Sequence, residues 1–112
     1  MQEIIIKEED NLEEIRQNLL KYKTEDIIFS NHALGQIEMR EGNKNEIIAL
    51  ILHPDNLVYS YSEKAKEGKT KHMLHFKISN NKTIILPVIF NRNLYIITYI
   101  LRHRAVWKKV GR

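Results

Sequence analysis

The hydrophobic pattern of this chain changes its period once, at Pro54. Before that residue, apolar side chains recur three or four positions apart, as on one face of an α-helix. From Leu57 onward they alternate every second position, as on one face of a β-strand. We therefore expect one α+β domain over residues 1–112, in which the helices precede the strands.

Two or three helices are predicted in the first half of the chain. The first spans about residues 11–22 and takes Asp10 as its N-terminal cap. The second follows Ser30, another capping residue, and we expect Gly42 to end it in the left-handed conformation. The third is apolar nearly all round and ends before Pro54, because the residue preceding a proline disfavours helix.

Four strands joined by short turns are predicted in the second half. They cover residues 57–62, 70–78, 83–90 and 93–101. Pro87 lies within the third of them and cannot donate a backbone hydrogen bond, which indicates a sheet edge or a bulge. The expected fold is thus a four-stranded antiparallel meander with the helices packed on one face.

Charge is divided unevenly along the chain. Residues 1–67 hold all 14 carboxylates and 8 Lys and Arg, for a net charge of −6. Residues 68–112 hold the other 10 Lys and Arg and no acid, for a net charge of +10. An acid-free basic half is typical of a surface that binds a polyanion such as nucleic acid. The alternative is a basic surface that only keeps the protein soluble.

Several classes of site are not indicated by the sequence. The chain has no cysteine, so neither a disulfide framework nor a thiolate metal site is expected. The basic half lacks the grouped carboxylates of a two-metal nuclease, and we predict no metal and no cofactor. Because no signal peptide is visible and the apolar runs are too short to span a membrane, we expect a cytoplasmic protein without membrane contact.

The segment SNHALGQIEMREG places His32, Gln36 and Arg40 in one polar line along the second predicted helix. The N-terminal end of a helix disfavours the charged imidazolium, so His32 is suited to act as a general base. The planar guanidinium of Arg40 is suited to binding a phosphate. The spacing equally allows two ordinary surface residues, with Arg40 paired to a neighbouring acid.

The segment KTKHMLHFK places Lys71, His75 and Lys77 on one face of the second predicted strand, whereas His72 points to the opposite face. We expect one histidine to face the helices and the other to face solvent. The face with the two lysines would be strongly basic. Such a face either contacts phosphates or is an ordinary solvated strand face.

Two further groups lie near the C-terminal end. Arg102, Arg104 and Trp107 combine cations with an aromatic ring, which suits phosphate contact and base stacking, although a solvated tail is the alternative. Thr98 and Tyr99 lie in the last predicted strand, where a buried hydroxyl would need a hydrogen-bond partner. They could equally be strand-favouring residues that fill the pleat.

The alternation of a strand fixes where these two side chains should point. If the last strand is unbroken, Thr98 shares its face with Ile96 and Ile100, and Tyr99 shares its face with Tyr95.

A family resemblance covers roughly residues 29–102. It is carried, in order, by SNHALGQIEMREG, NEIIALILHPDNLV and LPVIFNRNLYIITYI. The chain resembles a family of small uncharacterised domains with a His-Ala-Leu motif, an arginine eight residues later and a closing strand that ends in Thr-Tyr. That family is similar to the RelE-like and barnase-like (BECR-type) toxin nucleases, in which helices precede a four-stranded antiparallel sheet. Residues 1–26 would then be a helical extension of this core.

The resemblance implies a metal-independent endoribonuclease of the toxin–antitoxin type, which cleaves single-stranded RNA through attack by the ribose 2′-hydroxyl. The matching positions are His32 as base or acid, Arg40 as a cation on the phosphate, and Thr98 and Tyr99 to orient the substrate. Lys71 and nearby lysines would stabilise the developing charge. The implied partners are RNA and a small antitoxin protein.

A non-catalytic nucleic-acid- or protein-binding module of the same fold is the second hypothesis. The family often has a second arginine where this chain has Gln36, and this difference favours the module. A third hypothesis is a structural domain that uses its divided charge to self-associate as a homodimer. These hypotheses differ in whether replacing His32 removes RNA cleavage.

Overall fold

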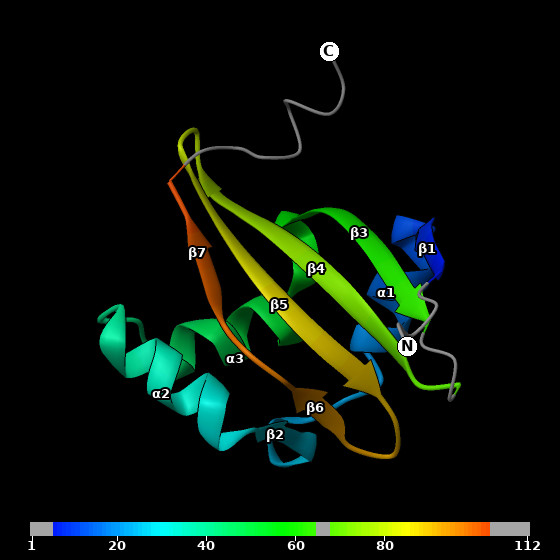
Figure 1. Ribbon diagram of the computed structural model, residues 1–112, viewed down its shortest axis with the longest axis horizontal. Coiled ribbons are helices and arrows are strands. Elements are labelled where there is room, and N and C mark those ends of the chain that lie inside the picture. Colours follow the sequence, from blue (N-terminus) through cyan, green and yellow to red (C-terminus); the bar gives the residue numbers. More distant parts are fainter. Residues whose placement is uncertain (1–5, 65–67, 104–112) are drawn as a thin grey trace, which may run out of the picture.

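The computed structural model describes residues 6–64 and 68–103, and these form two layers, with the helices on one face of a sheet (Figure 1). The expected α+β class is confirmed, and so are three helices within the described residues. The expected four-stranded antiparallel meander is not confirmed, because the described residues form a larger, mixed sheet of seven strands.

The elements follow one another in a fixed order. The helices are α1 (Leu12–Leu19), α2 (Asn31–Met39) and α3 (Lys44–Leu52), and short 3₁₀ turns cover Thr24–Asp26 and Pro54–Asn56. The strands are β1 (Ile6–Glu9), β2 (Ile27–Phe29), β3 (Leu57–Lys64), β4 (Thr70–Ser79), β5 (Lys82–Phe90), β6 (Leu94–Ile96) and β7 (Ile100–Arg102).

The strands lie side by side in the order β1-β3-β4-β5-β6-β2, and β7 also pairs with β5. The described strand pairs are antiparallel except for β2 with β6, which are parallel. β6 and β7 lie end to end along one edge of β5, since they pair with residues 88–90 and 83–85 respectively. The last strand expected from the sequence is therefore two strands.

The core lies between the helices and the inner face of the sheet. On the sheet side it is built from alternate residues of β4 and β5, which are fully buried: Leu74, Phe76, Ile84, Leu86 and Val88. On the helix side the buried residues recur at helical spacing: Ile15, Leu19, Ala33, Ile37, Ile47, Leu50 and Ile51. β1 and α1 thus belong to the same sheet and core as the rest of the described chain.

The start of α1 differs from the prediction. Asn11, not Asp10, is the N-terminal cap, because its side chain accepts a hydrogen bond from the Glu14 amide at 3.0 Å. The Asp10 carboxylate is directed into the sheet instead, where it accepts a hydrogen bond from Ser60 Oγ at 2.6 Å. The predicted cap, Asp10, was thus one residue too early, and its carboxylate holds Ser60 of β3 and not the start of the helix.

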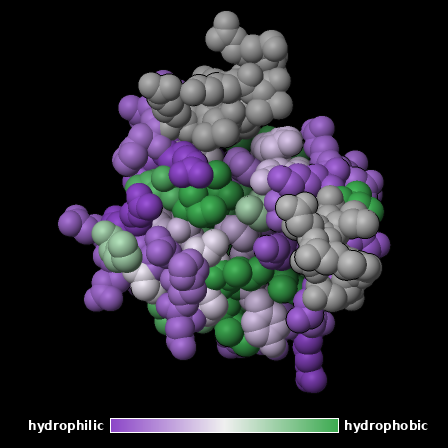
Figure 2. All heavy atoms as spheres, viewed as in Figure 1, coloured by the Kyte–Doolittle hydropathy of each residue, from purple (hydrophilic) through white to green (hydrophobic). Residues whose placement is uncertain are grey.

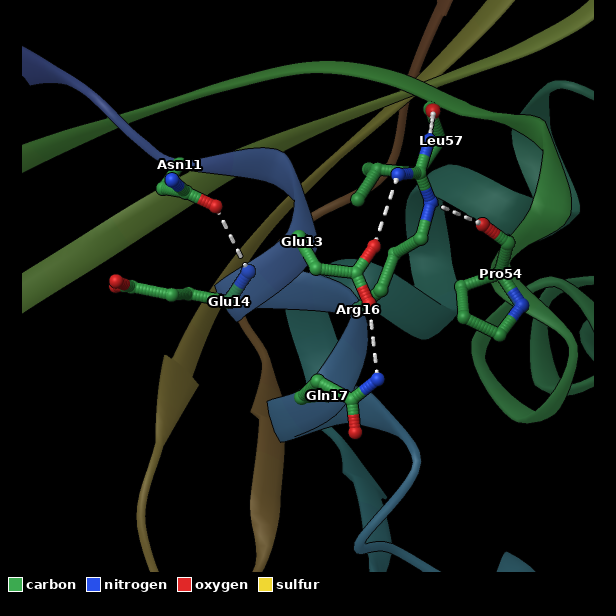
Figure 3. Close-up of polar contacts among 7 residues, drawn as sticks. All are labelled: Asn11, Glu13, Glu14, Arg16, Gln17, Pro54 and Leu57. Atoms are coloured by element: carbon green, nitrogen blue, oxygen red, sulfur yellow. Dashed lines mark hydrogen bonds and ion pairs between the residues drawn. The ribbon is translucent and has the colours of Figure 1, made fainter.

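Arg16 fastens α1 to the segment that leads into β3 (Figure 3). Its Nη2 donates to the Leu57 carbonyl at 2.8 Å and its Nε donates to the Pro54 carbonyl at 3.4 Å. Glu13 lies one turn earlier and forms an ion pair with Arg16 Nη1 at 3.8 Å.

No helix in the described part of the chain has the length and apolar character to cross a membrane.

Candidate functional site

Helix α2 begins against the gap between β6 and β7. Ser30, its N-terminal cap as predicted, accepts from the Ala33 amide at 2.9 Å and donates to the Ile97 carbonyl at 2.6 Å. The Ser30 amide also donates to the Ile96 carbonyl at 3.0 Å. One serine therefore starts the helix and fixes its first turn to the sheet.

The gap itself, residues 97–99, lies opposite Pro87 of β5. The Ile97 amide donates to the Pro87 carbonyl at 2.9 Å, but Pro87 has no N–H with which to continue the ladder. Ile96 is paired with Val88 and Ile100 with Ile85, so three residues of one strand face two of the other. Of the edge or bulge predicted at Pro87, the edge is absent because β5 is an inner strand, and the extra residue lies on the strand that faces the proline.

This extra residue reverses the alternation of side chains beyond it. Ile96 is fully buried on the helix side with its partner Val88, whereas Ile100 pairs with Ile85 on the opposite face. The expectation that Thr98 shares its face with both Ile96 and Ile100 is therefore wrong. Tyr99 and Tyr95 also differ, since Tyr99 is 3% exposed and Tyr95 is 41% exposed.

Helix α2 ends against the ring of Tyr99. The Gly42 amide donates to the Ile37 carbonyl at 2.7 Å and the Glu41 amide to the Glu38 carbonyl at 3.1 Å, which is a Schellman motif. Its left-handed residue is Glu41, with φ of 55°, and not Gly42 as predicted. Space favours glycine at 42 for another reason: a Cβ there would lie 3.1 Å from Tyr99 Oη, which is a tight contact.

We refer to α2 with Arg40, together with residues 97–99, as the seam. The two sides are joined at both ends, by Ser30 with Ile97 and by Gly42 with Tyr99. The four residues predicted to be catalytic belong to these segments, with His32 and Arg40 on the helix side and Thr98 and Tyr99 on the strand side. They differ in exposure: the side chains of His32 and Arg40 are exposed, Thr98 is half-buried and Tyr99 is buried.

Burial and charges of opposite sign act on the pKa of the Tyr99 hydroxyl. Burial raises the pKa of Tyr99 above its ordinary value, the carboxylate of Glu46 raises it further, and the guanidinium of Arg40 lowers it. At neutral pH the hydroxyl therefore keeps its proton and can donate a hydrogen bond to an anion.

His32 and Arg40 are separated by eight residues of α2, about 12 Å along the axis. Side chains of a helix lean toward its N-terminus, which applies to both residues and leaves their separation unchanged. The two groups can therefore meet neighbouring phosphates of one strand. Among the described residues, no hydrogen bond fixes the His32 side chain, which is free to turn toward a ligand.

The face of the sheet turned away from the helices is the open face (Figure 1). The register of β4 places Lys71, His75 and Lys77 on it, as predicted, opposite Glu63, Tyr59 and Thr83 respectively. Figure 2 shows apolar side chains gathered in the middle of this face and polar ones toward its margin. The open face is therefore less uniformly basic than the sequence indicated.

His75 is not solvated, although it lies on the open face. It is 5% exposed and packs against Tyr59 and Tyr61, with ring centroids 5.1 Å and 6.0 Å away. Its Nδ1 lies 3.0 Å from the Met73 carbonyl oxygen, and burial lowers its pKa below the ordinary value. His75 is thus neutral at pH 7, and Lys71 and Arg102 are exposed cations of this face. The predicted RNA contacts Arg104 and Trp107 lie outside the described residues.

His72 points to the opposite face, as expected, and has a partner that sequence reasoning missed. Its Nδ1 lies 3.0 Å from Asp10 Oδ2, the same oxygen that accepts from Ser60 Oγ. A carboxylate only accepts hydrogen bonds, so Nδ1 carries the proton and Nε2 is left for other contacts. Ser60 donates to Asp10 and not to His72, which is not the order of a Ser–His–Asp nucleophile.

His72 also lines a pocket of about 560 Å³, at the end of the sheet where β4 begins and β5 turns into β6. Other residues around it are Lys69, Thr70, Phe90, Asn91 and Tyr95. One signal could have indicated the pair: residues 68–112 contain no acid, so a carboxylate for an inward-facing His72 had to come from the first 67 residues.

Comparisons with family models, with curated proteins and with solved structures found no match for this chain. The described residues contain no group of three or more His, Cys, Asp or Glu that could hold a metal ion. The seam, the open face and the pocket are therefore the features of the structure that bear on function.

Proposed function

We propose that this protein binds single-stranded RNA along the seam and cleaves it without a metal ion, as a RelE-like or barnase-like nuclease of the toxin type. The observation that carries the proposal is the attachment of α2 at both ends to residues 96–99. This attachment supports the proposal, because it holds the helix that carries His32 and Arg40 against the segment that carries Thr98 and Tyr99.

In the proposed reaction His32 takes the proton of a ribose 2′-hydroxyl, and the 2′-oxygen attacks the adjacent phosphorus. The bond to the 5′-oxygen breaks, and this oxygen receives a proton from the imidazolium. The products are a 2′,3′-cyclic phosphate and a free 5′-hydroxyl. Arg40 binds the neighbouring phosphate of the strand, while Thr98 and the protonated Tyr99 orient the phosphorane by hydrogen bonds.

Charge supports RNA as the ligand. Within the described residues, β4 to β7 carry lysine and arginine but no carboxylate. Arg102 is exposed on β7, which follows the seam, and Lys71 is exposed on β4 of the same open face. Both cations can contact the phosphates of a bound strand. An acidic antitoxin protein would cover the same cations and so block access.

Cleavage of labelled single-stranded RNA in excess EDTA tests the proposal. We expect products that end in a cyclic phosphate, and a loss of at least about 100-fold in rate for His32→Ala. The matched control is His53→Ala, which removes another exposed histidine away from the seam. Absence of cleavage, or cleavage that EDTA abolishes, contradicts the proposal.

The second candidate is RNA binding without turnover. It is favoured by the lack of a fixed partner for His32 within the described residues and by Gln36, where the resembling family often has an arginine. This candidate predicts salt-sensitive binding, no cyclic-phosphate products and equal affinities for the protein before and after His32→Ala.

A further inference from the structure

The pocket beside His72 lies at the other end of β6 from the seam. Its volume of about 560 Å³ is within the range of pockets that enclose small ligands, about 300–1,000 Å³. The cation Lys69 is exposed at its margin, and Thr70 adds a hydroxyl. The pocket therefore offers donors for an anion.

Aromatic rings form other parts of the wall. The Phe90 ring is held by an edge contact with His72, at 5.0 Å between centroids, and by stacking on Tyr22 at 6.2 Å. Tyr95 pairs with Ile89 on the open side and leaves 41% of its surface exposed. An exposed ring next to a cation suits a ligand that joins a planar base to a phosphate.

His72 is positioned before any ligand arrives. Asp10 fixes the ring through Nδ1, and Ser60 holds the carboxylate of Asp10 in turn. The side chains of Asp10 and His72 are 11% and 20% exposed, so the pair is largely buried but His72 still reaches the pocket. A ring held in this way presents Nε2 in one direction, which favours a specific hydrogen bond.

We infer that the pocket is a subsite for one unpaired nucleotide of the bound RNA. The phosphate binds Lys69 and Thr70, and the base stacks on Tyr95. His72 Nε2 and the Asn91 amide contact the edge of the base at the end of the sheet, where β4 and β5 no longer pair beyond His72 and Val88. This inference rests on the RNA-binding role proposed above. Thr98 follows Tyr95 by three residues, about 10 Å of extended chain, so one strand can reach both the pocket and the seam.

Titration of the full chain with nucleoside 5′-monophosphates, followed by amide NMR, tests the subsite. We expect shifts confined to the pocket, and binding at least about tenfold weaker for adenosine or inorganic phosphate alone. Lys69→Ala should weaken binding about tenfold. Lys82→Ala removes the same charge at the far end of β4 and β5 and should change it less than about twofold.

Two substitutions separate the ligand contact of His72 from its structural bond. His72→Asn keeps a donor near the position of Nδ1, and His72→Gln keeps one near Nε2. We expect His72→Asn to fold stably but bind the nucleotide weakly, and His72→Gln to bind better but unfold more easily. If nucleotide binding of the two variants falls only in proportion to their loss of folding stability, His72 is not a ligand contact.

Other outcomes also decide the matter. If inorganic phosphate binds as tightly as the nucleotide, the pocket is only an anion site. If Lys69→Ala and Lys82→Ala weaken binding equally, the attraction is unspecific. Either result overturns the subsite. RNA cleavage without nucleotide binding in the pocket overturns this inference alone. Nucleotide binding without any RNA cleavage overturns the proposed nuclease and leaves the subsite standing.

Discussion

Gly42 lies so close to Tyr99 that a Cβ built at Gly42 would be 3.1 Å from the tyrosine Oη and 3.2 Å from Cζ. Tyr99 is 3% exposed, so its ring has little room to move away. We expect Gly42→Ala to lower the free energy of unfolding by about 1–3 kcal/mol through overpacking, as measured by urea denaturation.

The same helix contains a matched control. A Cβ at Gly35 meets nothing within 4 Å, and Gly35 lies inside α2. Gly35→Ala should therefore stabilise the protein by about 0.5–1 kcal/mol, the usual gain for alanine over glycine in a helix. Equal effects of the two substitutions would show that contact with Tyr99 is not what requires Gly42.

Glu41 adopts φ of 55° at the end of α2, a conformation that costs a residue with a Cβ about 1–2 kcal/mol. Glu41→Gly should thus stabilise the fold by about 1 kcal/mol and raise the melting temperature by about 4 °C. Glu41→Ala is the control, since it removes the charge but keeps the strain. A gain as large for alanine would assign the effect to charge.

His75 should make stability depend on pH in one direction. Burial lowers its pKa below the ordinary 6.5, so above pH 6.5 both folded and unfolded chains hold it neutral and its full contribution is present. As the pH falls below 6.5, the unfolded chain takes up the proton first, and stability is lost until the folded pKa is reached.

Urea unfolding at about pH 7.5 and about pH 5.5 measures this loss. One proton changes the free energy of unfolding by at most about 1.4 kcal/mol per pH unit. His75→Phe keeps an aromatic ring beside Tyr59 and Tyr61 but cannot take up a proton. Between the two pH values this variant should therefore lose less stability than the parent protein. Parallel pH profiles for the two proteins would contradict the assignment to His75.

RNA affinity should fall with salt in proportion to the cations that contact phosphate. For single-stranded RNA, removing one contact reduces the slope of log K against log salt by about 0.7. We expect this reduction for Lys71→Ala on the open face, and no change for Lys21→Ala, an exposed lysine after α1. Fluorescence anisotropy at several salt concentrations gives both slopes.

Much of the local structure could be predicted, because it depends on neighbouring residues. The cap at Ser30 and the alternation that separates His72 from His75 are both set within a few positions of the chain. β1 and β2 could not be predicted in this way. They have four and three residues, too few for the alternation of strand side chains to be recognised.

The missed parts of the site depend on residues far apart. The bulge at residues 97–99 was indicated by Pro87, but the strand that would carry it was not, and one extra residue decides where Tyr99 points. Asp10 and His72 are 62 positions apart, so no spacing rule links them. Such pairs are fixed by the arrangement of the sheet and become visible only in three dimensions.

The contacts that form the seam also determine at which stage of synthesis and folding the seam can form. Ser30 and Ile97 are 67 positions apart, and β2 joins β6 across a similar separation. Contacts between such distant positions form late in folding, because the loop between them must close first. A chain still being synthesised lacks the seam until β6 and residues 97–99 have emerged from the ribosome. Any activity that needs the seam therefore stays off until then.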